Sequence, residues 1–415
     1  MNDFHSRFEL NYKKRLLTQL ISPAIERFPV VVLSGARQVG KSTLLQNEFP
    51  NFKYVNLDDF NILRQARSDP ASLWINENRV IIDEAQRVPE IFPSIKVAVD
   101  RARGKKKFII SGSSNLLLMQ KITESLAGRA IYFELMPMTY GEIKEDWQGG
   151  NRFLSLWEKN FTISEQEVGY IDPLPFMLKG FMPALLRLSE SRDILLWWES
   201  YIKTYIERDL RELSQIESLV DFKRVLDCLA LRTANVLNQT EIARDAGVSQ
   251  PTAHRYIRLL EVSDIIKRVP SFAKNRSKRI TKSPKIFFVD PALSVYLSGY
   301  HDEDSLRGAR ELGSFFETMV FFHLTVMCEM LVPKAKLFYF RTTTGREVDF
   351  VLEQGKKLIA VEVKYTKNPG FEHIRNLLYF MEEYPETLRG LLIHAGSSIK
   401  WLHSKVIAIP WWWIG

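Results

Sequence analysis

The segment Gly35-Ala36-Arg37-Gln38-Val39-Gly40-Lys41-Ser42-Thr43 constrains the fold of this chain more than any other feature. It fits the pattern G-x-x-x-x-G-K-[ST], in which glycines let successive backbone N–H groups turn toward phosphate oxygens. An apolar run at 29–33 precedes it and a helix-like run follows it, which is the required strand–loop–helix context. An ordinary glycine-containing turn is the alternative. We expect all nine residues to bind ATP, with Lys41 reaching the β- and γ-phosphates and the Ser42 hydroxyl binding Mg²⁺.

A second motif, Val80-Ile81-Ile82-Asp83-Glu84, is an apolar strand that ends in two acids. We expect this strand to lie directly beside the strand before the loop. Asp83 would then hold Mg²⁺ through water, and Glu84 would act as the base that polarises the attacking water. The alternative is a strand that happens to end in a solvated acidic turn.

A third strand, 107–110, runs into Ser111-Gly112-Ser113-Ser114-Asn115. Ligands of open α/β sheets bind at the carboxyl ends of the strands, which is where these small polar residues fall. Asn115 is our candidate for sensing the γ-phosphate. A simple Gly/Ser turn explains the segment equally well.

Composition places the chain among multidomain globular proteins. Its 415 residues are 46% hydrophobic, enough for two to four domains with sizeable cores. The formal net charge of +8 is compatible with a DNA partner. Two cysteines without metal-ligand spacing, and no apolar run near the ~18 residues of a membrane span, predict a cytoplasmic protein without a membrane partner.

The chain divides into four predicted regions. Residues 1–145 alternate strands (29–34, 52–57, 79–83, 107–111 and 130–135) with helices, which predicts an α/β domain with a mostly parallel sheet. Residues 146–217 form a helical lid or linker, in which Gly149-Gly150 marks an expected break. Residues 218–300 and 301–415 form two further domains.

The third region has the pattern of a winged helix. Residues 240–246 and 250–260 read as two helices around the turn Gly247-Val248-Ser249, and strands at 265–269 and 286–289 follow. The second helix exposes side chains that contact bases or phosphates in nucleic-acid complexes, and the expected hairpin tip is basic. The candidate nucleic-acid contacts are Gln250, Thr252, His254, Arg255 and Arg258 on the helix, and Lys274, Arg276, Lys278 and Arg279 on the wing. Protein–protein packing is the alternative use of such a fold.

The fourth region carries a second chemical constellation, nuclease-like in its residue types. Glu362 and Lys364 are two apart on a strand and therefore share a face. A hairpin would bring Asp349 beside them, and Glu317 would approach from a helix. Grouped carboxylates can hold Mg²⁺, and a nearby lysine can activate water for phosphodiester attack. A salt-bridged strand pair without metal is the alternative.

Taken together, these motifs resemble a prokaryotic family of AAA-like P-loop ATPases with a C-terminal domain of uncharacterised function related to PD-(D/E)xK nucleases. The matching segments are Gly35–Lys41, Asn56-Leu57-Asp58-Asp59, Asp83-Glu84-Ala85-Gln86, Ser111-Gly112-Ser113-Ser114, Leu126-Ala127-Gly128-Arg129, Pro137-Met138-Thr139-Tyr140-Gly141-Glu142, Arg208-Asp209-Leu210, Glu347-Val348-Asp349-Phe350 and Glu362-Val363-Lys364. The resemblance implies an AAA+-like ATPase core, a winged helix and a nuclease-like module in that order. It also makes Arg129 a candidate phosphate-sensing or finger arginine, with a plain surface salt bridge as the alternative.

Three functions are therefore open at this point. The first is an Mg²⁺-dependent ATPase whose nucleotide state controls the winged-helix and nuclease-like modules. The second is a DNA-binding or docking regulator that uses ATP as a slow switch and has no nuclease activity. The third is an Mg²⁺-dependent nuclease licensed by ATP.

Overall fold

The computed structural model describes residues 12–112, 125–209 and 216–415, which fall into two units. The first unit comprises the described residues up to Met138 together with 262–264. The second comprises the rest of the described chain, from Thr139 to Gly415. No helix in the described part of the chain combines the length and apolarity needed to cross a membrane.

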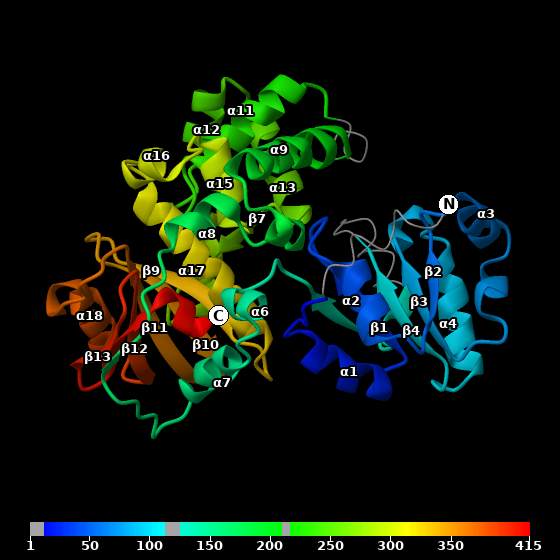
Figure 1. The fold of residues 1–415 in the computed structure, drawn as a ribbon, viewed down its shortest axis with the longest axis horizontal. Helices are drawn as coiled ribbons and strands as arrows, with labels where there is room; N and C mark the ends of the chain where they lie inside the picture. Colours follow the sequence, from blue (N-terminus) through cyan, green and yellow to red (C-terminus); the bar gives the residue numbers. More distant parts are fainter. Residues whose placement is uncertain (1–11, 113–124, 210–215) are drawn as a thin grey trace. The chain divides into compact units, whose positions relative to one another are not determined.

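A five-stranded parallel sheet forms the centre of the first unit, in the order β2-β3-β4-β1-β5 (Figure 1). The α/β fold predicted from the alternating pattern is thus confirmed. Each strand lies within one residue of its expected bounds: β1 Val30–Ser34, β2 Lys53–Asn56, β3 Arg79–Asp83, β4 Lys107–Ser111 and β5 Ala130–Glu134.

One expected strand neighbour was wrong. The acidic strand β3 does not lie beside β1, because β4 pairs with both of them and lies between. Parallel strands are about 4.8 Å apart, so Asp83 lies two strand spacings from the strand that enters the loop. The carboxyl end of β4, where Ser111 lies, therefore separates the two.

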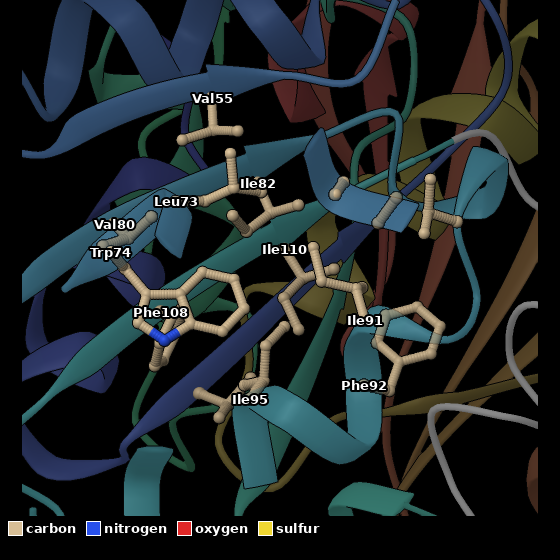
Figure 2. Packing of buried hydrophobic residues seen from close by; sticks show 14 of the residues in the cluster. Val55, Leu73, Trp74, Val80, Ile82, Ile91, Phe92, Ile95, Phe108 and Ile110 are labelled. Carbon is tan, nitrogen blue, oxygen red and sulfur yellow. The ribbon is translucent and has the colours of Figure 1, made fainter. Parts of the chain in front are cut away.

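Helices cover both faces of this sheet. They are α1 Thr18–Arg27, α2 Lys41–Glu48, α3 Phe60–Ser68 and α4 Ile91–Arg101, with 3₁₀ turns η1 Pro70–Trp74 and η2 Ala85–Arg87. Figure 2 shows the core on one face, where side chains of η1 and α4 pack against those of β3 and β4. Trp74 meets Phe108 edge to face with ring centroids 5.3 Å apart. The core side chains on this face are almost completely buried. Because protein interiors are close-packed, this core holds the strands rigidly.

The second unit begins with a helical segment. Its elements are α6 Tyr140–Lys144, α7 Gln148–Ser155, α8 Leu174–Lys179, η3 Pro183–Arg187, α9 Ser191–Tyr201 and the π-helical η4 Ile202–Asp209. The expected break at Gly149-Gly150 was wrong, because α7 runs through both residues. A Cβ on Gly149 would lie 2.7 Å from the carbonyl oxygen of Gly415, so close packing accounts for this glycine.

A helix-turn-helix arrangement follows. The elements are α11 Leu219–Ala230, α12 Gln239–Ala246, α13 Gln250–Val262, β7 Ile266–Val269, α14 Arg276–Thr281, β8 Lys285–Phe288, α15 Pro291–Leu297 and α16 Glu303–Arg307. The two expected helices and the antiparallel strand pair are present. The expected basic hairpin tip was wrong, because α14 occupies the connection between β7 and β8.

A mixed seven-stranded sheet completes the second unit, in the order β6-β13-β14-β12-β11-β10-β9. Its strands are β6 Gln166–Glu167, β9 Lys336–Arg341, β10 Glu347–Gln354, β11 Lys357–Lys364, β12 Thr387–His394, β13 Ser398–His403 and β14 Val406–Pro410. Helix α17 Leu312–Glu329 contacts β11, and η5 Phe371–Ile374 leads into α18 Arg375–Glu383. Side chains of α18 pack on one face of the sheet, through Leu377 and Phe380.

The run of three tryptophans near the end of the sequence packs inside this unit. Trp411 and Trp413 lie in the 3₁₀ turn η6 Trp411–Ile414 and are buried. The indole N–H of Trp411 donates to the Ile171 carbonyl at 3.0 Å. The expectation that this run is a buried contact rather than a ligand site agrees with this packing.

Candidate nucleotide site

The phosphate loop between β1 and α2 takes a conformation that depends on glycine. Gly35 has φ +143°, and a Cβ there would lie 2.3 Å from the carbonyl oxygen of Leu135. Gly40 precedes α2 in the left-handed region with φ +92°, and Gln38 also has a positive φ of 64°. Alternating backbone conformations of this kind turn N–H groups toward one concave side, which is how such loops surround phosphate. Within the loop Ala36 and Val39 are buried, whereas Thr43 in the first turn of α2 is exposed.

The Lys41 side chain is folded into this loop. Only 6% of the residue is exposed, and its Nζ donates to the carbonyls of Gly35 and Ala36 at 2.9 and 2.8 Å. Burial lowers the pKa of Lys41, while the carboxylates of Glu84 and Asp83 act in the opposite direction. The loop carbonyls therefore fix the ammonium group, which interacts electrostatically with the two acids predicted for the same site.

Arg15 supports the loop through hydrogen bonds that no sequence pattern predicts. Its guanidinium donates to the Val39 carbonyl at 2.9 Å and to those of Met136 and Pro137 at 2.6 and 3.0 Å. These bonds tie the loop to the chain that leaves β5. No periodicity or motif marks an arginine near the N-terminus for this purpose, because the contact spans more than 120 residues.

Asp83 lies at the carboxyl end of β3 and is held by three donors. The hydroxyls of Tyr54 and Ser111 and the backbone N–H of Glu84 all donate to its carboxylate. The Tyr54 hydroxyl also interacts with the Ser42 side chain, and burial raises the pKa of Tyr54. Tyr54 therefore joins the two residues predicted to bind Mg²⁺, although the sequence analysis did not single it out. Ser42 and Asp83 fit an Mg²⁺ ion, which prefers a few oxygen ligands and retains several waters.

Glu84 has a strained backbone at the same edge of the sheet. Its φ of 57° lies in the left-handed region, which costs about 1–3 kcal/mol for a residue other than glycine. Gln86 donates a hydrogen bond to its carboxylate. Burial raises the pKa of Glu84, against the effect of the Gln86 hydrogen bond. A carboxylate whose pKa is raised is a better proton acceptor than an exposed one.

One predicted member, Arg129, does not join this group. Arg129 precedes β5, whose first residue pairs with Val30 at the start of β1, so Arg129 lies at the opposite end of the parallel sheet from the loop. Its guanidinium pairs with Asp100 at 2.7 Å. The geometry thus corrects the assignment of Arg129 to the phosphate site of its own chain, in favour of the salt bridge. Asn115 lies outside the described residues.

The candidate nucleic-acid residues on α13 lie mostly on its exposed side. Gln250, His254, Arg255 and Arg258 are exposed, and Thr252 is half-buried. Several are already engaged, since Arg255 pairs with Glu217 at 3.1 Å and His254 lies 3.1 Å from the Gln239 amide oxygen.

The predicted wing residues differ in their exposure to solvent. Lys274 and Arg276 are exposed, while Lys278 lies on α14 with its side chain outside the described part. Arg279 is not a free cation, which corrects its assignment as a phosphate contact. Its guanidinium makes two hydrogen bonds to Glu353, at 2.8 and 3.0 Å, and is 11% exposed.

In the second unit the structure brings together the four nuclease-like residues. Asp349 on β10 accepts a hydrogen bond from the Val363 N–H at 2.8 Å, and Lys364 pairs with Glu362 at 2.8 Å. Burial and the neighbouring Asp349 carboxylate raise the pKa of Glu362, and Glu317 interacts with both residues from α17. One oxygen of Glu362, Oε2, is buried without a hydrogen-bond partner in the structure.

A lysine that the sequence analysis missed stands among these acids. Lys285 on β8 is 3% exposed, and its Nζ lies 2.9 Å from Glu317, 2.5 Å from Glu347 and 3.9 Å from Asp349. Burial alone would lower the pKa of Lys285, but these carboxylates outweigh burial and raise it. The described residues contain no group of three or more His, Cys, Asp or Glu arranged to hold a metal ion. An ammonium group therefore lies among the carboxylates for which a divalent cation was expected, and metal binding by this cluster stays a prediction.

Residues 27–144 match the family described as an AAA domain. Residues 175–304 and 312–414 match two domains of unknown function, DUF8612 and DUF4143. The AAA match contains the phosphate loop and the acidic strand, so it agrees with the geometry above and supports ATP binding by the first unit.

Related whole chains add similarity without a named activity. The uncharacterized protein Rv2008c of Mycobacterium tuberculosis is 29% identical over 390 residues, covering 93% of this chain and 81% of that protein. The uncharacterized protein MJ1544 of Methanocaldococcus jannaschii is 22% identical over 374 residues, covering 85% and 79%. Among solved structures, the Walker-type ATPase PABY2304 of Pyrococcus abyssi aligns with a TM-score of 0.46 at 16% identity, covering 70% of this chain and 97% of that one.

Proposed function

We propose that the first unit is an Mg²⁺-dependent ATPase. The loop N–H groups and Lys41 bind the phosphates, Ser42 and Asp83 hold Mg²⁺, and Glu84 accepts a proton from the attacking water. Phosphoryl transfer to water needs positioning and charge stabilisation more than covalent chemistry, and these residues supply both.

The proposal is carried by one observation. Four functional groups, two from the start of α2 and two from the carboxyl end of β3, interact at this edge of the sheet: the Lys41 ammonium, the Ser42 hydroxyl and the carboxylates of Asp83 and Glu84. An ordinary glycine-containing turn would give no reason for the Lys41 ammonium, at the start of α2, to interact with both Asp83 and Glu84. Raised pKa at Glu84 and a strained backbone there are both typical of catalytic sites.

Nucleotide binding tests this site directly. Lys41→Ala removes a charge-assisted contact to the phosphates, so ATP affinity measured by isothermal titration calorimetry should fall about 100-fold. Lys96→Ala, an exposed lysine on α4, is the matched control and should bind as the parent does. Equal affinity of the parent and Lys41→Ala would contradict the assignment.

For the second unit we propose that nucleotide state controls a nucleic-acid-binding winged helix and the C-terminal module. The exposed face of α13, with Arg258 and Gln250, supports a DNA contact. The position of Lys285 favours the docking regulator over the licensed nuclease, because an internal ammonium group already neutralises the acids that would bind a catalytic Mg²⁺.

A further inference from the structure

A cationic cavity lies within the second unit, apart from the exposed face of α13. It has a volume of about 760 Å³, inside the range of 300–1,000 Å³ typical of ligand sites. Its lining comes from β7, α14, β9 and β10 and from the segments that flank α14. The cavity forms because the chain leaving β7 pairs with β9: Tyr339 donates to the Pro270 carbonyl at 3.0 Å, and Ser271 bridges to the same strand.

The charge of this lining is strongly one-sided. Five cations face it, Arg268, Arg276, Arg279, Lys282 and Lys336, against the single carboxylate of Glu353. Glu353 is committed to Arg279, and Arg268 pairs with Glu261 at 3.1 Å. Within the described residues, no carboxylate lies within salt-bridge distance of Arg276, Lys282 or Lys336. Three positive charges are therefore available to an anion.

One wall of the cavity is formed by Arg279, whose side chain is held by several contacts. The Arg279 guanidinium lies 4.4 and 4.7 Å from the ring centroids of Phe272 and Phe338, and its Nε donates to the Ala273 carbonyl at 2.6 Å. These contacts and the Glu353 pair fix the base of α14. Arg279 is thus held against β9 and β10 rather than extended on a free hairpin tip.

Apolar side chains complete the lining between the cations. Pro270, Pro284 and Leu337 offer hydrocarbon surface beside the positive charges. A duplex hides its bases and presents phosphates and sugar, whereas a single strand presents bases as well as phosphates. A cavity lined by both cations and apolar side chains therefore suits a single strand better than a duplex.

We propose that this cavity binds the backbone and bases of a single-stranded nucleic acid, with Arg276, Lys282 and Lys336 contacting phosphates. The site is distinct from the α13 surface, and it requires neither ATP hydrolysis nor duplex binding by α13. It also gives a use to the basic segment of α14 that differs from the minor- or major-groove contact of a wing.

The test is binding of a labelled oligothymidylate to the full chain, measured by fluorescence anisotropy. An excess of a non-hydrolysable ATP analogue occupies the phosphate loop, so that the oligonucleotide cannot bind there. The double variant Arg276→Glu/Lys336→Glu should weaken binding about tenfold or more, and its salt slope should flatten by about 1.4, since each single-strand phosphate contact contributes about 0.7. Arg276→Gln/Lys336→Gln gives the same direction with a smaller effect and replaces the first variant should that fail to fold.

Two matched variants locate the effect. Lys405→Glu reverses an exposed charge in the turn between β13 and β14, four strands from β9, and should leave oligothymidylate binding unchanged. Arg258→Glu on α13 should weaken duplex binding without affecting the single strand, so the two surfaces fail independently. Cavity variants that bind like the parent, duplex DNA that competes as well as the single strand, or polyglutamate that displaces it equally would each overturn the proposal.

Discussion

Tyr54 shows how one hydroxyl organises the proposed metal ligands. It donates to Asp83 and meets the Ser42 side chain, so it fixes both oxygens relative to each other. Groups that orient metal ligands typically change affinity or activity 10- to 100-fold when removed. Their sequence signal is weak, because a tyrosine on a strand is ordinarily interpreted as part of the core.

Removing this hydroxyl gives the first prediction. Tyr54→Phe should raise the Mg²⁺ concentration needed for half-maximal ATP hydrolysis about tenfold, while the ring still packs. Tyr132→Phe on β5, half-buried in the same unit, is the control and should behave as the parent does. An unchanged Mg²⁺ dependence in Tyr54→Phe would exclude this positioning role.

His323 makes stability depend on pH. Its Nδ1 donates to the Met319 carbonyl at 2.8 Å and its Nε2 accepts from the Tyr140 N–H at 3.1 Å, so both ring nitrogens are used by the neutral form. Burial lowers the pKa of His323 to about 4. A base with a lowered pKa in the folded chain contributes stability above pH 6.5 that is lost as the pH falls toward 4.

The expected contribution of His323 alone is a loss of about 2 kcal/mol of unfolding free energy at pH 5 relative to neutral pH, measured by urea denaturation as the difference between the parent and His323→Gln. Burial also lowers the pKa of His394 to about 4, so His323→Gln should remove about half of the combined slope rather than all of it. His301→Gln, at an exposed position, is the control. A pH slope that is the same in His323→Gln as in the parent would contradict the assignment.

At the scale of elements, Lys285 links β8 to α17 and β10. The lysine comes from the helix-turn-helix region and its partners come from the C-terminal sheet region, so the ion pairs fasten the two parts of the second unit together. Sequence spacing revealed Glu317, Asp349, Glu362 and Lys364 because each lies in a recognisable motif. Lys285 follows a serine and a proline on a separate strand, and nothing in its neighbourhood ties it to that motif.

Breaking this cluster should be costly. Lys285→Met leaves three buried or half-buried carboxylates without their cation, and removal of one partner of a buried pair typically costs about 3–5 kcal/mol. Thermal unfolding should show the loss, and Lys285→Met/Glu317→Gln should recover part of it by removing one unpaired carboxylate. Lys405→Met is the exposed control. A stability loss below about 1 kcal/mol would mean that the cluster is not held by Lys285.

At the scale of the whole molecule, the sequence predicted most of the first unit. Alternating apolar runs located every strand of the parallel sheet to within one residue, because buried parallel strands are continuous apolar segments. The order of the strands could not be predicted, because it depends on which face of the sheet each connecting helix crosses. Long-range polar contacts such as Arg15 with Met136 and Lys285 with Glu317 escaped for the same reason: neither partner carries a local signal of the other.

The central claim is that the residues at the carboxyl edge of the five-stranded sheet hydrolyse ATP. Steady-state release of phosphate from ATP with Mg²⁺ tests it most directly, on the parent and on Glu84→Gln, with Glu90→Gln at an exposed neighbouring position as control. Glu84→Gln keeps the shape of the side chain and removes the proton acceptor, so it should retain ATP binding while its turnover falls about 100-fold or more. Glu90→Gln should hydrolyse ATP at the parental rate. Equal turnover by Glu84→Gln and the parent, with equal ATP binding, would contradict the account.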